Sequence, residues 1–145
     1  MQNRYVGDIG DFGKFGLLRK IEEAGFKIGI NWYLRTDEDH NKDGKHIQYL
    51  LDNKYSRYDQ ALFSYLQQIV KENKRSLREV ERSGLLKNAI FYSEPLSYKS
   101  TRTNERRKER TAWHQKSMDT LNLCEIIFLD PDNGLQVKSV SLTSN

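Results

Sequence analysis

The sequence predicts a Rossmann-like α/β domain, in which helices on both faces of a mainly parallel sheet make three layers. Short apolar runs alternate with longer amphipathic stretches, as parallel strands and their crossover helices do. Two of the apolar runs lead directly into polar clusters, which is typical of strands that end at a binding site. The chain has 145 residues and contains no linker or internal repeat, so residues 1–145 are expected to form a single domain.

The first half of the chain is expected to supply a helix, a buried strand and a polar loop. Asp11 is expected to cap a helix that runs to Ala24. Residues 26–34 (FKIGINWYL) are typical of a strand, and the mostly apolar second half of this run indicates burial. The polar stretch RTDEDHNKDGKH follows, and a short helical or irregular piece is expected at residues 46–51.

The second half continues the alternation of helices and strands. Helices are expected at residues 58–72, 76–83 and 103–121, and strands at residues 89–92 and 125–129. In the first of these helices, Leu62, Leu66 and Ile69 lie on one side. Strands separated by helices favour parallel pairing, because a parallel neighbour needs a long crossover connection.

The composition indicates a globular protein with a heavily charged surface, since charged residues make up 30% and hydrophobic residues 37% of the chain. No apolar run approaches the roughly 18 residues that span a membrane, so no membrane partner is expected. The residues after Met1 lack the apolar core of a signal peptide, and Cys124 is the single cysteine. We therefore expect a cytoplasmic protein in which Cys124 is a buried thiol, with the oligomeric state left open.

Two polar clusters are expected to meet at one edge of the sheet. The run NWYL leads into RTDEDHNKDG, and the run IIFL leads into DPDNG. The carboxyl ends of parallel strands lie at the same edge, where ligands of such folds bind. We therefore expect Asp130 at the end of a central strand, facing the same cleft as residues 37–43. So many carboxylates at one edge require a cation or hydrogen-bond donors that offset their repulsion.

The DPDNG cluster has two interpretations. In the first, Asp130, Asp132 and Asn133 form a strand-ending turn in which side chains bond local backbone amides. In the second, these three residues are catalytic. Asp130 and Asp132 then project toward a ligand or hold Mg²⁺ or Mn²⁺, which prefer hard oxygen ligands.

Two further clusters supply candidate cofactor-binding residues. The stretch GDIGDFGK precedes a helix, so its amides can meet an anion; otherwise it is a capped helix start with Lys14 on the surface. The loop after the first strand follows a buried segment, where polar residues are often functional, although His40 can be incidental and residues 43–44 a simple turn. We expect the residues of the first cluster to approach Asp130. The candidates in the two clusters are Asp8, Asp11, Lys14, Asp37, His40, Asp43 and Gly44.

A basic window spans residues 99–116. Seven lysines and arginines there are opposed by Glu105 and Glu109, so the window carries a net charge of +5, against +4 for the whole chain. Arginines beside an aromatic residue, here Trp113, suit the phosphates and bases of nucleic acid. The same pattern also fits a solvated helix face. The candidate nucleic-acid-binding residues are Arg102, Arg106, Arg107 and Arg110.

The motifs GDIGDFGKFGLLR and FLDPDNG resemble those of a group of uncharacterised bacterial and phage proteins with the patterns G-D-x-G-D-F-x-K-[YF]-x-L-L-R and F-L-D-P-D-N-G. This resemblance covers most of the chain and implies no particular reaction. More distantly, the layout is similar to class I S-adenosylmethionine-dependent methyltransferases, notably the ribosomal RNA adenine-N6 enzymes with a D-P-P-Y type motif. That similarity implies that Asp130 and Pro131 hold the target amine, and that residues 33–44 lie over the cofactor.

The chain departs from the methyltransferase pattern in three respects. Asp132 and Asn133 replace the second proline and the aromatic residue, Gly44 is the single glycine of the cofactor loop, and eleven residues follow Gly134. A truncated or degenerate member is therefore expected. Three functions stay open: a methyltransferase-like domain that uses S-adenosylmethionine and acts on or binds nucleic acid or nucleotide, a Mg²⁺- or Mn²⁺-dependent nuclease or nucleotide phosphohydrolase, and a non-catalytic binding or regulatory protein.

Overall fold

The protein has an α/β fold built on a small open sheet of three parallel strands, arranged in the order β2-β1-β3. The computed structural model describes residues 1–37, 44–97 and 99–131. The strands are β1 (Ile28–Asn31), β2 (Ile90–Tyr92) and β3 (Ile126–Leu129).

The three strands end at the same edge of the sheet. Asn31 at the end of β1 lies opposite Tyr92 in β2 and Leu129 in β3. The prediction of parallel strands whose carboxyl ends meet is therefore confirmed. The expected central position of the strand before Asp130 is wrong, because in the described sheet β1 is central and β3 lies at an edge.

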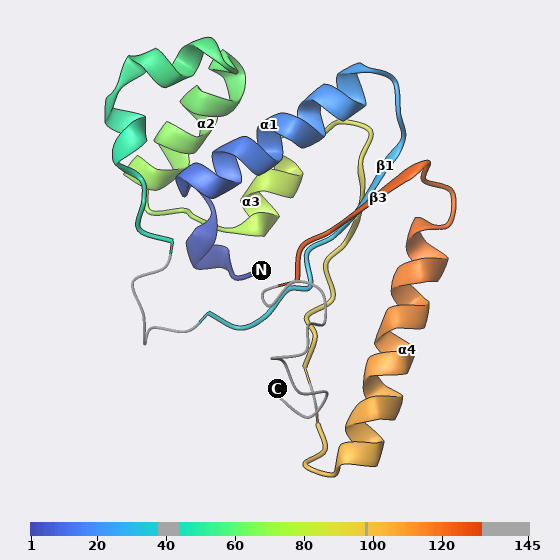
Figure 1. Cartoon of the computed structure of the whole chain (residues 1–145). Helices are drawn as coiled ribbons and strands as arrows, with labels where there is room; N and C mark the ends of the chain where they lie inside the picture. The colour runs from blue at the N-terminus through green and yellow to red at the C-terminus, as the bar shows by residue number, and fades with distance from the viewer. Residues whose placement is uncertain (38–43, 98, 132–145) are drawn as a thin grey trace, which may run out of the picture.

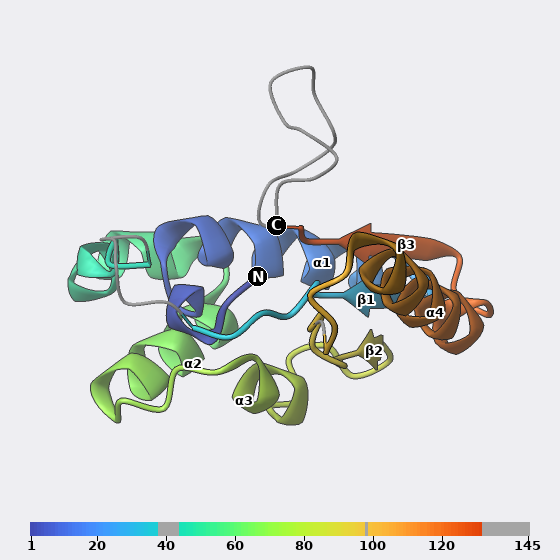
Figure 2. The same ribbon diagram turned by 90° about the horizontal axis from the view of Figure 1, so that it is seen from below.

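Helices cover both sides of the sheet (Figures 1 and 2). On one side lie α1 and α3, with α2 against α1, and on the other side lies α4. The prediction of a helix at residues 103–121 is confirmed by α4. The helices are α1 (Ile9–Glu23), α2 (Gln60–Lys71), α3 (Leu77–Arg82) and α4 (Thr103–Leu121), with short 3-10 helices η1 (Asn3–Tyr5), η2 (Gln48–Leu51) and η3 (Asn53–Arg57).

The larger hydrophobic core lies between the sheet and the helices α1 to α3. Ile28 and Ile30 of β1 are fully buried there, together with Phe15 and Leu18 of α1. Burying a large apolar side chain contributes roughly 1.5–3 kcal/mol, so this cluster is the main source of stability. A smaller core lies under α4 and contains Tyr92, Trp113 and Leu121.

The strand β1 turns small and polar residues toward α4. A Cβ atom on Gly29 would lie 3.0 Å from Cys124 Sγ and 3.2 Å from Leu121 Cβ, so the end of α4 approaches the strand closely because Gly29 has no side chain. Asn31 Nδ2 donates a hydrogen bond of 2.8 Å to Ser117 Oγ of α4. Cys124 is half-buried, not buried as expected.

The start of α1 and the extent of β1 differ most from the prediction. Asp8, not Asp11, caps α1, because Asp8 Oδ1 accepts from the amide of Gly10 at 3.0 Å, which places Asp11 in the first turn. The strand expected at residues 26–34 is shortened to four residues. Its end is set by Tyr33, whose φ of +48° is incompatible with extended backbone.

Within the described part of the chain, no helix combines the length and the apolar character needed to cross a membrane.

Candidate functional site

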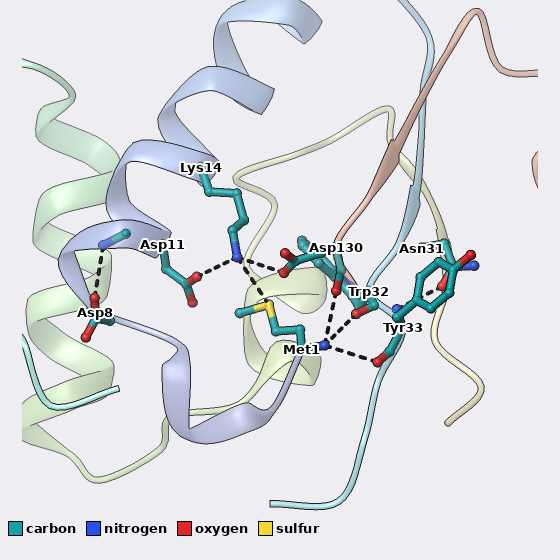
Figure 3. A network of polar contacts seen from close by, with 9 residues as sticks. Met1, Asp8, Asp11, Lys14, Asn31, Trp32, Tyr33 and Asp130 are labelled. Atoms are coloured by element: carbon teal, nitrogen blue, oxygen red, sulfur yellow. Dashed lines mark hydrogen bonds and ion pairs between the residues drawn. The ribbon is translucent and has the colours of Figure 1, made fainter. Parts of the chain in front are cut away.

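Lys14 joins α1 to the end of β3 at the carboxyl edge of the sheet (Figure 3). Its ammonium nitrogen Nζ lies 3.0 Å from Asp11 Oδ1 and 2.7 Å from Asp130 Oδ2. The amide of Asp130 also donates to the carbonyl of Asn31, which fixes the backbone of Asp130 beside β1. The expectation that Lys14 approaches Asp130 is confirmed. The alternative of a Lys14 on the open surface is wrong.

Burial dominates the electrostatics of Asp11. Its exposed fraction is 3%, and desolvation raises its pKa from 3.8 to about 6, although Lys14 opposes this shift. Burial alone would lower the pKa of Lys14, but the carboxylates of Asp11 and Asp130 outweigh burial and raise it. Asp11 Oδ2 is buried and has no hydrogen-bond partner among the described residues. The site therefore contains a carboxyl group that titrates near neutral pH and has one unused oxygen.

The α-amino group of Met1 is a second cation at this edge. It donates hydrogen bonds to the carbonyl oxygens of Trp32 at 2.9 Å, Tyr33 at 3.1 Å and Asp130 at 3.1 Å. Met1 is 1% exposed, and its sulfur lies 3.8 Å from Lys14 Nζ. These bonds tie the ends of β1 and β3 together. The sequence carries no signal for this role.

Several predicted cofactor residues bond the backbone of nearby loops. Asp8 Oδ2 accepts from the amide of His46 at 2.9 Å, in addition to capping α1. Asp37 Oδ1 accepts from the amide of Arg4 at 3.3 Å. Gly44 has a φ of +76°, and a Cβ atom there would lie 2.5 Å from the Arg4 carbonyl oxygen. Asp8, Asp37 and Gly44 therefore hold the segments around the site in place.

Arg75 is a structural residue that the sequence analysis missed. Its guanidinium donates to the carbonyl oxygens of Val6 at 2.6 Å and Gly44 at 2.5 Å, and also to the carbonyl of Arg4. Arg75 precedes α3 and shows no distinctive pattern in the sequence. It connects the loop before α1 to the segment that leads into η2.

Four predicted site residues lie outside the described residues: His40, Asp43, Asp132 and Asn133. Of the cleft expected between Asp130 and residues 37–43, residues 38–43 lie outside them too. Within the ranges that are described, no three His, Cys, Asp or Glu side chains converge as a metal site requires.

The basic window lies largely on α4. The N-terminal half of this helix extends past the carboxyl ends of the strands (Figure 1), the edge at which Asp130 follows β3. Arg102, Arg107 and Arg110 are exposed and Arg106 is half-buried. Arg102 Nη1 lies 3.5 Å from Glu105 Oε1, a weak surface ion pair.

An aromatic cluster links α4 to the end of β1. The ring centroids of Tyr33 and Trp113 are 4.9 Å apart, and those of Tyr92 and Trp113 are 5.3 Å apart. Trp113 Nε1 also donates to the carbonyl of Glu94 at 2.9 Å, which fixes the indole. Sequence reasoning placed Tyr33 inside a strand and missed its position in this cluster.

Comparison with protein-family models, with curated proteins and with solved structures finds no match for this chain.

Proposed function

We propose that this chain is a nucleic-acid-binding domain with a Rossmann-like, methyltransferase-like layout and a site at the carboxyl edge of its sheet. The observation that carries this proposal is the position of the basic half of α4. It projects past the same edge at which Lys14, Asp11 and Asp130 meet. A polyanion bound along α4 therefore runs toward these side chains.

The charge of α4 suits a phosphate backbone. Residues 102–110 span about 12 Å of helix, a length over which a nucleic acid strand carries about three phosphates. The segment contains Arg102, Arg106, Arg107, Lys108 and Arg110 against two glutamates. Such a surface binds nucleic acid with an affinity that falls as salt is raised, because bound cations are released from the phosphates.

The predicted cofactor-binding residues that the structure describes are poorly placed to bind S-adenosylmethionine. Asp8, Asp37 and Gly44 are all engaged with protein backbone, and Gly44 faces the Arg4 carbonyl rather than open space. Asp130 does fit the role of amine acceptor, because its carboxylate already accepts from the ammonium of Lys14. The methyltransferase-like layout is therefore proposed for the fold and for Asp130, and we propose no methyl-transfer step.

A Mg²⁺- or Mn²⁺-dependent nuclease or phosphohydrolase is the second candidate. The unused oxygen of Asp11 and its proximity to Asp130 favour it, because two carboxylates that share an edge can hold a divalent ion. Lys14 lies between these carboxylates and is paired with both, so an ion has to displace its ammonium group. If neither S-adenosylmethionine nor a metal ion binds, the proposed function is nucleic-acid binding without catalysis.

Nucleic-acid binding is tested with a triple variant of α4. Replacing Arg106, Arg107 and Arg110 by glutamine is expected to weaken binding of a short oligonucleotide and to lower the slope of log affinity against log salt by about 2. The control replaces Lys71, Lys74 and Arg78 by glutamine, which removes the same charge from α2, α3 and the loop between them. Equal affinities and equal salt slopes for the two triple variants contradict the proposal.

The two cofactor alternatives are separated by calorimetry with S-adenosylmethionine, Mg²⁺ and Mn²⁺ on the wild type and on Asp130→Asn. Asparagine keeps the hydrogen-bonding shape but removes the charge. In the metal-dependent hydrolase, heat of metal binding and oligonucleotide cleavage both fall steeply in the variant. In the methyltransferase-like protein, cofactor binding largely survives the change and metal has no effect.

A further inference from the structure

We propose that Tyr33 is the base-stacking residue of this site and that the nucleic acid is taken up as a single strand. This inference rests on the proposed nucleic-acid-binding function and names its substrate class. Stacking of bases on aromatic side chains, beside a basic surface that follows the backbone, is the general way in which proteins hold single strands.

The backbone of Tyr33 is held in an unfavourable conformation. Its φ of +48° lies in the left-handed region, which residues with bulky side chains rarely adopt. Such conformations persist where surrounding contacts impose them, and they gather at binding sites. Tyr33 lies two residues after the end of the central strand, at the edge where ligands of α/β sheets bind.

Three parts of the fold impose this conformation. The amide of Tyr33 donates to Asn31 Oδ1 at 2.9 Å, and the carbonyl of Tyr33 accepts from the α-amino group of Met1 at 3.1 Å. Asn31 is itself fixed by its 2.8 Å hydrogen bond to Ser117 of α4. The position of Tyr33 is therefore set by β1, by α4 and by the N-terminus, as Figure 3 shows in part.

Tyr33 is the accessible member of the aromatic cluster. Tyr92 is 5% exposed and Trp113 is 8% exposed, whereas Tyr33 is half-buried. The hydroxyl of Tyr92 donates to the carbonyl of Trp113 at 3.0 Å, but the hydroxyl of Tyr33 makes no hydrogen bond to any described residue. Two buried rings thus support a third ring that reaches the surface.

The cluster also joins the basic window to the end of β1, beside the backbone of Asp130. Trp113 lies on α4, three residues after Arg110 and seven after Arg106, so the three side chains project from one face of the helix. The carbonyl of Tyr33 and the carbonyl of Asp130 accept from the same Met1 nitrogen. A strand whose phosphates contact the arginines of α4 can therefore place a base on the ring of Tyr33, which faces α4, whereas the carboxylate of Asp130 faces Lys14 of α1. Bases paired inside a duplex cannot stack in this way.

The test compares three probes: a short oligothymidylate, an abasic phosphodiester of the same length, and a duplex of the same length. Tyr33→Asn deletes the ring and keeps the backbone, because asparagine tolerates the left-handed region. Tyr33→Phe keeps the ring, and Tyr58→Asn removes an aromatic ring that is 60% exposed and remote from the site, as a matched control. Unfolding curves verify that each variant is folded.

Wild type is expected to bind oligothymidylate more tightly than the abasic strand and the duplex. Tyr33→Asn is expected to lose roughly five- to 150-fold in affinity for oligothymidylate, to lose the preference over the abasic strand and to keep the salt slope. Tyr33→Phe and Tyr58→Asn are expected to bind as the wild type does. The inference is overturned if Tyr33→Asn loses the same affinity for all three probes or loses none. It is also overturned if the wild type binds the duplex more tightly than oligothymidylate. In each of these cases the proposed nucleic-acid-binding function is unaffected. If the wild type binds none of the probes, the proposed function itself fails.

Discussion

The titration of Asp11 makes a quantitative prediction about stability. Burial raises its pKa from 3.8 to about 6 in the folded protein, a difference that corresponds to about 3 kcal/mol between the protonated and ionised forms. Because the folded-state pKa is above the unfolded value, the folded protein keeps a proton that the unfolded chain has lost. The free energy of unfolding therefore falls as pH rises, by about 2.4 kcal/mol between about pH 4 and about pH 7 from this group alone.

Asp11→Asn removes this pH dependence. The amide cannot ionise, so the free energy of unfolding of the variant minus that of the wild type is expected to rise by about 2.4 kcal/mol across the same pH range. Costs that do not depend on pH cancel in this comparison. One such cost comes from the buried atom Asp11 Oδ2, which has no hydrogen-bond partner among the described residues. In the variant an atom of the asparagine side-chain amide takes its place and is buried in the same way.

The assay is urea denaturation followed by circular dichroism at several pH values. Asp52→Asn is the matched control, because Asp52 is an exposed carboxylate whose hydrogen bond with Lys54 lowers its pKa. The difference between this control and the wild type is expected not to rise with pH. A flat or falling difference for Asp11→Asn refutes the reasoning, since it means that Lys14 outweighs burial and keeps Asp11 ionised throughout.

Three further predictions concern the frame of the site. Gly13→Ala is expected to raise the free energy of unfolding by about 1 kcal/mol, measured by thermal denaturation, because a Cβ atom there meets nothing within 4 Å; a lower stability means that the helix is strained there. One residue added before Met1 turns the ammonium into an amide with a single N–H, and is expected to lower the free energy of unfolding by at least about 3 kcal/mol. Stability is measured before and after the extension is cleaved, and equal values contradict the hydrogen bonds described for Met1. Arg75→Met is expected to lower the free energy of unfolding, measured by urea denaturation, by about 2–4 kcal/mol. If Arg75→Met lowers it less than the control Lys71→Met does, Arg75 has no structural role.

The parts of the fold that follow from local pattern could be predicted. The helix α4 has the predicted bounds, and the alternation of strands and helices led to parallel pairing with a shared carboxyl edge. These inferences need only periodicity and the geometry of parallel sheets. The contact between Lys14 and Asp130 was expected on other grounds, namely the glycine spacing of residues 7–14 and the resemblance of this motif to a known group.

What failed depends on tertiary contacts that local sequence does not specify. Asp8 and Asp11 both precede helical residues, and Asp8 is fixed as the cap by its bond with the Gly10 amide and by a second bond with the amide of the distant His46. Gly44 was taken for a cofactor glycine, but the close approach of the Arg4 carbonyl explains it. The left-handed Tyr33 had no signal at all, because tyrosine normally favours a strand and the bonds that turn it come from residues far along the chain.

Gly29 sets the orientation of α4, and with it the position of the basic window relative to the sheet. The missing side chain lets the C-terminal end of α4 approach β1, while the arginines lie toward the other end of a helix of 19 residues, a length of about 28 Å. A tilt of the helix about its contact with Gly29 therefore moves the distant N-terminal end the most. A methyl group that tilts it by about 5° carries the far end through about 2.5 Å, most of the length of a hydrogen bond. A substitution in the sheet interior, remote from the basic window, thereby shifts the arginines of α4 relative to the carboxylate site.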